Sequence, residues 1–389
     1  MKIRWSILIA TCGLFVVVGP TFAQIATPHC YGIASSADGS KLVAVASYGN
    51  AGAIYTSTNS GATWTQQTNA PNQNWYSVAS SADGAKLAAG PESGPIYIST
   101  NGGVEWMPTA TSATFWTSIA SSADGTKLVA EQGHPFMGPI CTSDDSGLTW
   151  TSNNVPSLFW ESVASSADGR KLVTVATTGE IYTSTNAGGS WLQQASTGLY
   201  WTSVASSADG VKLVAVWGIG GIATSTNSGV TWTITSAPTE LWTSVASSAD
   251  GSKLAAVSDD LDTSNPGLII TSTNFGLTWT TNNGPDFAYW SSVTLSADGN
   301  KLAATPYDGN TIYTSQSTSS PHLNLALVGN NLNISWIVPS TNFVLQQNPD
   351  LTTTNWVTLT NAPALNFTNL QDVVNLSPTN NTGFYRLTL

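Results

Sequence analysis

The stretch that decides the fold is WESVASSADGRKLVTVATTGEIYTSTNAGGSW, from Trp160 to Trp191, because related copies of it recur along the chain. It holds short alternating runs rich in Val, Tyr, Thr and Trp, separated by Asp-Gly and Asn-x-Gly turns. Such runs predict four strands per copy, of the forms WxSVAS, KLVAV, IYTST and TWTxx, with a hairpin at Asp-Gly, where glycine accepts a positive φ. The copies begin at Tyr31, Trp75, Trp116, Trp160, Trp201, Trp242 and Trp290.

The spacing of the copies indicates how these strands assemble. Copies recur roughly every 40 to 50 residues, a period typical of the four-stranded blades of a propeller. We therefore predict an all-β fold class, with a seven-bladed β-propeller over residues 24–320. The seventh copy ends at IYTSQSTSS and lacks a fourth strand. We expect Gln24 to Ala26 to supply that strand, so that both ends of the propeller close the ring.

A shorter phrase, first seen as STNSGATW at Ser57 to Trp64, occurs six times between the third and fourth strands. Its paired Asx and Trp residues are Asn59 and Trp64, Asn101 and Trp106, Asp145 and Trp150, Asn186 and Trp191, Asn227 and Trp232, and Asn274 and Trp279. The phrase resembles the Asp-box, or BNR, repeat of sialidases, sortilin-type receptors and photosystem II assembly-factor propellers. Five of the six copies carry Asn where that family has Asp. Because an amide oxygen accepts backbone N–H groups as a carboxylate does, we expect a structural turn rather than metal or catalytic chemistry.

The resemblance to sialidases would imply an arginine triad, a Tyr–Glu nucleophile pair and an Asp acid. The arginines of this chain are Arg4 near the start, Arg170 in an Asp-Gly turn and Arg386 near the end. One propeller arginine cannot form a triad, so sialidase activity is disfavoured. The lysines of the repeats share one position after the Asp-Gly turn, which indicates a structural role at that turn. They are Lys41, Lys86, Lys127, Lys171, Lys212, Lys253 and Lys301.

The start of the chain has the features of a Sec-type export signal over residues 1–23. Lys2 and Arg4 precede a mostly apolar run, and small residues lead to a cleavage site after Ala23. The run is shorter than the roughly 20 residues of a membrane span. We therefore expect a secreted, periplasmic or cell-surface protein without a membrane span.

The net charge limits the possible partners, and the positions of the cysteines limit the possible disulfides. The net charge is −11, which makes nucleic acid and anionic membranes poor partners. Cys30 and Cys141 fall in the first and third copies, whose blades would not be neighbours. We therefore expect two unpaired thiols.

A binding site is expected on the loop face, which the resemblance assigns to the loops between second and third strands and between successive blades. These loops carry the irregular carboxylates, and several blades place an aromatic residue immediately before the inner-strand tryptophan. Aromatic rims bind sugars and peptides by stacking, while carboxylates on the rim are candidates for sugar chemistry. The candidate binding residues are Phe115, Phe159, Tyr200, Trp217, Glu131, His134, Glu180, Asp260 and Asp308.

No metal and no cofactor are predicted. The acidic loop Asp259-Asp260-x-Asp262 has oxygen ligands but matches no EF-hand spacing, and His134 has no Cys or His companion.

The tail, residues 321–389, lacks the repeat and reads as short strands with Asn-rich turns, which predicts a small β-sandwich-like domain. It is similar to C-terminal modules of secreted bacterial proteins, with FVLQQNPDLTTTNW and a final FYRL. That resemblance implies a role in attachment or sorting.

The leading hypothesis is a secreted, non-catalytic, monomeric propeller that binds a protein or a neutral glycan on its loop face. The alternative is a glycan-active hydrolase that uses rim carboxylates, and a deep loop-face pocket with two carboxylates would favour it. A third hypothesis, an assembly factor, rests on the family resemblance alone.

Overall fold

The computed structural model describes residues 18–24, 29–47, 52–112, 114–133, 136–259, 267–282, 289–307, 309, 311–317, 321–329, 331–339, 343–350, 352–377 and 383–388. Every regular element within these ranges is a β-strand, which confirms the all-β prediction.

Within the described residues, seven four-stranded antiparallel sheets follow one another, six of them built from one sequence copy each and the seventh from the last copy and an N-terminal strand. The first three comprise β2 (Cys30–Ser35), β3 (Leu42–Ala46), β4 (Ala53–Ser57) and β5 (Thr65–Gln66); β6 (Trp75–Ser80), β7 (Leu87–Pro91), β8 (Tyr97–Ser99) and β9 (Met107–Pro108); and β10 (Trp116–Ser121), β11 (Leu128–Gln132), β12 (Ile140–Ser143) and β13 (Thr151–Ser152). The next three comprise β14 (Trp160–Ser165), β15 (Leu172–Ala176), β16 (Glu180–Ser184) and β17 (Leu192–Ser196); β18 (Trp201–Ser206), β19 (Leu213–Trp217), β20 (Ile222–Ser225) and β21 (Thr233–Ile234); and β22 (Leu241–Ser247), β23 (Leu254–Asp259), β24 (Ile269–Ser272) and β25 (Thr280–Asn282). The seventh joins β26 (Trp290–Leu295), β27 (Lys301–Pro306) and β28 (Thr311–Gln316) to β1 (Val18–Gln24).

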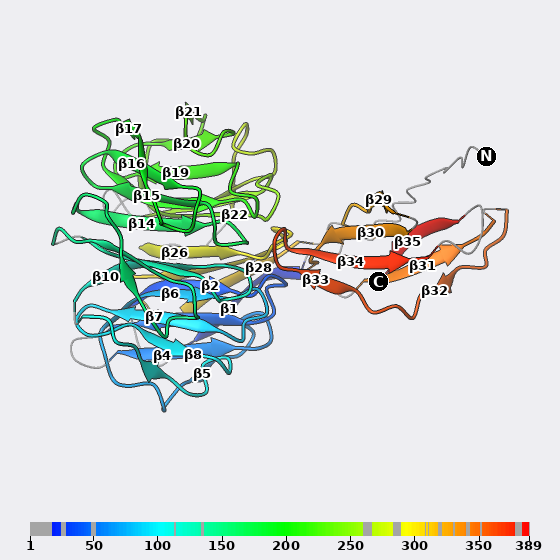
Figure 1. The fold of residues 1–389 in the computed structure, drawn as a ribbon, viewed down its shortest axis with the longest axis horizontal. Coiled ribbons are helices and arrows are strands. Elements are labelled where there is room, and N and C mark those ends of the chain that lie inside the picture. The colour runs from blue at the N-terminus through cyan, green and yellow to red at the C-terminus, as the bar shows by residue number, and fades with distance from the viewer. Residues whose placement is uncertain are drawn as a thin grey trace.

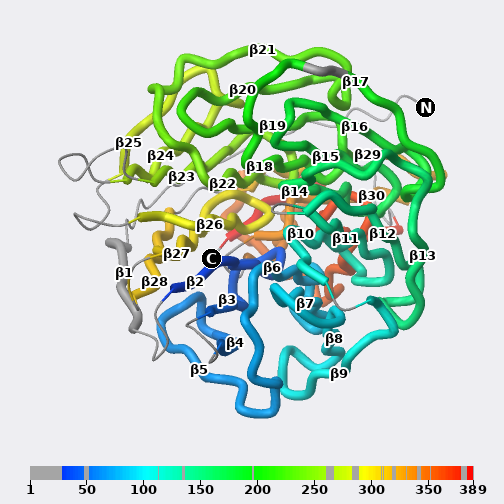
Figure 2. Tube along the Cα trace, turned by 90° about the vertical axis from the view of Figure 1, so that its left-hand side faces the viewer, coloured from blue at the N-terminus to red at the C-terminus, as the bar shows by residue number. Residues whose placement is uncertain are grey.

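The sheets are arranged around a common centre, with the first strand of each copy innermost (Figure 2). Each inner strand contacts the inner strands of both neighbouring sheets, and β2 of the first sheet contacts β26 of the seventh. Beyond the inner strands, the alanine of each Ser-Ala-Asp-Gly turn donates its N–H to the alanine carbonyl of the next sheet at 2.6–2.8 Å. Ala297 donates to Ala37, so this circuit of hydrogen bonds closes on itself. We call it the alanine ring: Ala37, Ala82, Ala123, Ala167, Ala208, Ala249 and Ala297.

The register of the first sheet differs from the sequence prediction by one residue. Cys30 pairs with Ala46 as Trp75 pairs with Pro91, so the first copy begins at Cys30 rather than at Tyr31. The other six inner strands place a tryptophan at this position, and each of these side chains is at most 1% exposed. The expectation that every inner strand begins with an aromatic residue is therefore wrong for the first copy, where the smaller Cys30 fills the core position.

The seventh sheet is completed from the N-terminal side, by β1 pairing antiparallel with β28. The sequence prediction placed Gln24 to Ala26 here, but only Gln24 belongs to β1, and residues 25–28 lie outside the described residues. The strand also overlaps the predicted export signal. Cleavage after Ala23 would leave only Gln24 of β1.

The tail forms a separate body beside the sheets (Figure 1). Its strands make a four-stranded sheet of β29 (Asn324–Val328), β30 (Asn331–Ile337), β34 (Gln371–Leu376) and β33 (Ala364–Asn366), and a three-stranded sheet of β32 (Val357–Thr358), β31 (Val344–Asn348) and β35 (Phe384–Thr388). Buried residues from both sheets, among them Trp336 and Leu345, form one apolar core.

The tail docks on the alanine ring. Leu370, at the end of the β33–β34 connection, belongs to both apolar clusters that the seven alanines form. Its backbone has a positive φ of 54°, and its carbonyl accepts the Val338 N–H at 3.0 Å. Val338 packs with Ala37 and Ala297 in the same place. This end of the ring is therefore covered, and the start of the inner strands lies at the other end.

Candidate functional site

The Asx residues of the six recurring phrases hold turns. In the first, Asn59 Oδ1 accepts the Thr63 N–H and the Ser57 hydroxyl, both at 2.9 Å, and Ser57 Oγ accepts the Gly61 N–H at 2.9 Å. Asp145 accepts the equivalent N–H from Thr149 at 2.8 Å. The Thr149 donors lower the pKa of Asp145 to about 2. Amide and carboxylate thus make the same turn, which accounts for the exchange of Asp for Asn.

Three tryptophans of these phrases pack inwards on inner-strand tryptophans. Trp232 lies 6.1 Å from Trp201 between ring centroids, and its indole N–H donates to the Gly229 carbonyl at 3.0 Å. Trp106 and Trp150 make the same pair of contacts. These residues are architecture, and they carry no free reactive group.

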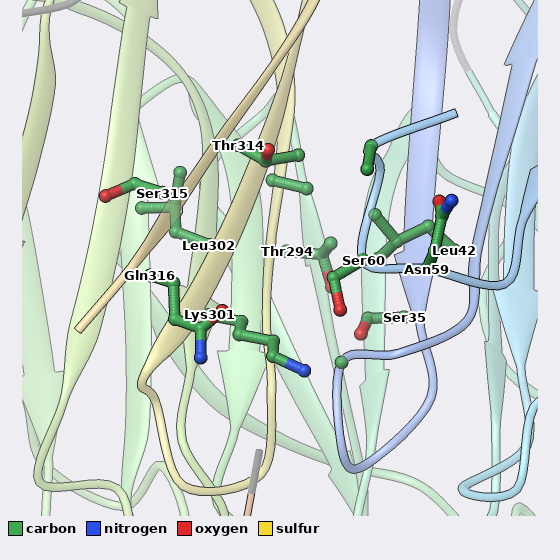
Figure 3. A pocket seen from close by; sticks show the side chains of 13 residues that line it. Ser35, Leu42, Asn59, Ser60, Thr294, Lys301, Leu302, Thr314, Ser315 and Gln316 are labelled. Atoms are coloured by element: carbon green, nitrogen blue, oxygen red, sulfur yellow. The ribbon is translucent and has the colours of Figure 1, made fainter. Parts of the chain in front are cut away.

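A crevice of about 160 Å³ lies between the first and seventh sheets, where Ser60 of the first turn faces Thr314 and Lys301 (Figure 3). Lys301 Nζ donates to the Asp38 carbonyl at 3.1 Å, and Lys41 and Lys212 bridge to the next turn in the same way. Equivalent residues line crevices between the first and second and between the fourth and fifth sheets. The crevices are therefore seams of the repeat, and the lysines join neighbouring sheets rather than only solvating a turn.

The cavity that is not repeated lies at the centre, among the first halves of the inner strands, and has a volume of about 380 Å³. Its wall includes the residue that follows the tryptophan in each WxSVAS strand, and the residue after Cys30 in the first. These second-position residues are Tyr31, Tyr76, Thr117, Glu161, Thr202, Thr243 and Ser291. None of them is among the predicted binding residues, although x is the varying letter inside an otherwise fixed pattern.

In the fifth, sixth and seventh sheets a hydroxyl at the second position joins neighbouring sheets, whereas Thr117 donates within its own sheet to the Glu131 carbonyl. Thr202 Oγ1 donates to the Trp242 carbonyl at 2.8 Å, and Thr243 Oγ1 donates to the Trp290 carbonyl at 2.7 Å. Ser291 Oγ donates to the Cys30 carbonyl. Tyrosine and glutamate replace this hydroxyl in the first, second and fourth sheets. Those three sheets give the cavity its particular chemistry.

Four aromatic rings form a continuous arc at the cavity mouth. Tyr31 lies 5.4 Å from Tyr307 and 5.2 Å from Tyr76, and Tyr76 lies 4.8 Å from Phe115, all between ring centroids. We call Tyr307, Tyr31, Tyr76 and Phe115 the aromatic arc. His29 extends it, at 5.2 Å from Tyr307. Of the predicted aromatic candidates, Phe115 therefore packs against Tyr76 of the cavity wall, without itself lining the cavity.

Glu161 and Asp259 supply carboxylates to the cavity wall. Oε2 of Glu161 is buried and has no hydrogen-bond partner. Burial raises the pKa of Glu161 to about 7. Burial also raises the pKa of Tyr76 and of Tyr200, and the negative charge of Glu161 adds to both shifts.

Glu131 does not lie on the rim, where the sequence prediction placed it. It pairs with Ser118 as Val175 pairs with Ser162, so it occupies a core position of β11 and is fully buried. Thr174 donates its hydroxyl to Oε2 at 2.7 Å, and Oε1 has no hydrogen-bond partner. Burial raises its pKa well above the ordinary value, and the Glu161 charge adds to this shift. Glu131 is therefore a core residue and does not line the cavity.

The remaining candidates lie away from the cavity wall or outside the described residues. Trp217 packs edge-on to Trp201 at 5.5 Å and has a structural role. Glu180 accepts a hydroxyl hydrogen bond from Thr178, and Phe159 is half-buried. Tyr200 is 50% exposed, within range of the Glu161 charge. His134, Asp260 and Asp308 lie outside the described residues.

Three further observations bear on the predictions. Cys30 and Cys141 are both buried and unpaired, which confirms that prediction. Among the described residues, no three His, Cys, Asp or Glu side chains are grouped to hold a metal ion. The described part of the chain has no helix with the length and hydropathy of a membrane span.

Comparisons with known proteins concern the fold. No family model and no curated protein matches this sequence. A solved structure of "YCF48 bound to D1 peptide" is similar with a TM-score of 0.59 and 16% identity, over 81% of this chain and 100% of that chain. The β-propeller domain of Cps50 (Swd1) from Myceliophteria thermophila is similar with a TM-score of 0.59 and 13% identity, over 78% of this chain and 100% of that chain. YCF48 from Cyanidioschyzon merolae is similar with a TM-score of 0.58 and 14% identity, over 76% of this chain and 98% of that chain. This chain therefore has a β-propeller fold.

Proposed function

We propose that the chain is a non-catalytic, seven-bladed β-propeller that binds a polypeptide partner in its central cavity. One observation carries the proposal: the second positions of the inner strands converge on the cavity, and three of them carry Tyr31, Tyr76 and Glu161 where the other four carry Thr or Ser. These three positions present half-buried aromatic and charged groups to the cavity. Binding surfaces typically contain groups of this kind.

The closed circuit of the alanine ring supports the seven-bladed arrangement. Because the tail covers that ring through Leu370, a partner has access to the cavity from the loop face. The similar YCF48 structure was solved with a peptide, which supports a polypeptide as the occupant. At 16% identity this likeness gives no residue of the peptide contact.

Export, and a β-sandwich-like tail for attachment or sorting, remain part of the proposal. They rest on residues 1–23 and on the resemblance of residues 321–389 to modules of secreted bacterial proteins. The six Asp-box-like turns are proposed as BNR repeats with a structural role, because their hydrogen bonds are made equally by Asn and Asp.

The test is a peptide array of random decapeptides probed with the labelled full chain, next to an array of neutral glycans. We expect peptide binding that is lost in Tyr76→Ala and kept in Tyr76→Phe, because the ring rather than the hydroxyl makes the contact. Binding to neither array would overturn the proposal. Binding that is insensitive to Tyr76→Ala would place the site elsewhere.

The runner-up is a glycosidase, which Glu161 and Asp259 favour because both carboxylates line one cavity. A pKa of about 7 would suit Glu161 to donate a proton to a leaving sugar. A panel of fluorogenic glycosides tests this alternative. Turnover that disappears in Glu161→Gln would show catalysis, whereas we expect no turnover. A sialoside should also stay intact, because the propeller has one arginine, Arg170.

A further inference from the structure

We propose that the central cavity recognises a cationic side chain of the partner, an arginine in preference to a lysine, held between the aromatic arc and Glu161. This inference rests on the proposed function and names the chemistry of the same site. It follows from the charge of the cavity wall, from an unsatisfied oxygen of Glu161, and from the arrangement of the rings.

The wall of the cavity is acidic. It includes Glu161 and Asp259, and none of its described residues is Lys or Arg. The charge of Glu92 adds to the raised pKa of Tyr31 and Tyr76, so a third carboxylate acts on this end of the cavity. An anionic side chain would be repelled here, and a cationic one would be attracted.

The lysines of the repeat do not reach this wall. Lys41, Lys212 and Lys301 donate through Nζ to the carbonyls of Asp-Gly turns, beyond the ends of the inner strands. The cations and the cavity are therefore at opposite ends of the inner strands. Among the described residues, therefore, no Lys or Arg neutralises the cavity wall.

Glu161 presents an acceptor that the protein leaves unused. A buried carboxylate oxygen without a donor costs free energy that a ligand donor can recover. Glu161 Oε2 is such an oxygen, on a side chain that lines the cavity. A guanidinium offers several N–H donors in one plane, and a charge-assisted bond to this oxygen would satisfy it. A neutral side chain would leave the charge of Glu161 uncompensated.

The aromatic arc favours a planar cation for an independent reason. The ring planes of Tyr31 and Tyr76 make an angle of 36°, and those of Tyr31 and Tyr307 an angle of 90°. The arc therefore presents both ring faces and ring edges. A cation within about 6 Å of a tyrosine face is attracted by the ring, and a guanidinium also stacks on it. Lysine can use the first interaction only, which is why we expect arginine to bind more tightly.

The experiment takes the tightest-binding decapeptides from the array and remakes each with Arg, Lys, citrulline or Glu at the position most sensitive to substitution. Affinities are measured by fluorescence anisotropy at pH 8, where Glu161 is mostly ionised, since its pKa is about 7. Citrulline keeps the shape of arginine and removes its charge. We expect arginine to exceed citrulline by tenfold or more, with lysine between them and glutamate not binding.

Protein variants then locate the preference. Glu161→Gln should abolish the preference for arginine over citrulline while leaving the citrulline peptide bound. Glu105→Gln changes an exposed carboxylate in the second Asp-box-like turn and should leave the preference intact. Equal binding of arginine and citrulline peptides, or a preference that survives Glu161→Gln, would overturn the inference. In either case Tyr76-dependent peptide binding would still support the proposed function, and absence of all peptide binding would remove both.

Discussion

Replacing Glu161 by glutamine should stabilise the protein, by an amount that depends on pH. The folded state raises the pKa of this carboxyl from 4.5 to about 7 because burial disfavours its charge. Each pKa unit corresponds to about 1.4 kcal/mol, so a shift of about 2.5 units gives roughly 3.5 kcal/mol. This is a ceiling, because the side chain lines an open cavity and solvent screens part of the effect.

The sign follows from the two protonation states. Below pH 4.5 the carboxyl is neutral in the folded and unfolded chain, and Glu161 imposes no penalty. As the pH rises from 4.5 to about 7, the unfolded chain ionises first, and the free energy of unfolding falls. Above pH 7 the loss is complete. Glu161→Gln should therefore match the wild type at pH 4 and exceed it by up to about 3.5 kcal/mol at pH 8.5.

The assay is urea unfolding followed by tryptophan fluorescence, at intervals from pH 4 to pH 9, with the same slope required of both proteins. Other groups also titrate in both proteins, among them Glu131, Tyr76 and Tyr200, whose pKa values respond to the charge of Glu161. The quantity to interpret is therefore the difference in the free energy of unfolding between the variant and the wild type at each pH. Glu105→Gln serves as the control and should give no pH-dependent gain. A gain of equal size at pH 4 and pH 8.5, or no gain at pH 8.5, would refute burial of an uncompensated charge.

Four further predictions concern the architecture. Trp232→Ala should cost about 2–3 kcal/mol in urea unfolding, below the cost for a fully buried Trp because Trp232 is half-buried, whereas Asn227→Asp should be nearly neutral; equal damage would contradict the tolerant turn. Leu370→Asp should release the tail from the alanine ring, seen as rapid proteolytic removal of residues 321–389 from an intact propeller, and unchanged resistance would show that Leu370 does not hold the tail. Thiol titration of the unfolded, unreduced chain should find both Cys30 and Cys141 reactive, and finding neither in a monomer would contradict the topology. The intact mass of the exported protein should correspond to a chain starting at Gln24; a longer chain that retains Val18 would instead preserve β1 as the outer strand.

The repeat made the sheets predictable from sequence, because every copy carries the same local signals. Alternation of apolar and polar residues predicts the strands, Asp-Gly predicts the hairpin between the first and second strands, and the Asp-box-like phrase predicts the turn between the third and fourth. The same reliance on local pattern caused the error in the first copy. An aromatic at Tyr31 looked equivalent to the tryptophans, whereas the register with Ala46 assigns that place to Cys30. The strand pairing, which the sequence alone does not show, decides whether Cys30 or Tyr31 occupies the core position.

The candidate site was less predictable, because its residues meet only when the sheets close around a centre. Phe115 was identified from its place before Trp116, and it joins the aromatic arc. Tyr76 and Glu161 were missed, since each is a single letter in a strand that otherwise looks structural. Glu131 was assigned to the rim from its position near a loop, but its register places it in the core opposite Thr174. That glutamate and that threonine lie in different copies, so no single copy reveals the pair.

Departures from the repeat are informative in this fold because the default residue has a known task. Thr202 and Thr243 at the second position each join two inner strands through one hydrogen bond, and in the second sheet Ser77 donates to the Trp116 carbonyl instead. Glu161 has no hydroxyl for this task, and burial of its carboxyl destabilises the chain as that group ionises, around pH 7. A ligand that compensates this charge would recover the cost, and Glu161→Gln should separate the two effects by gaining stability as it loses the preference for a cation.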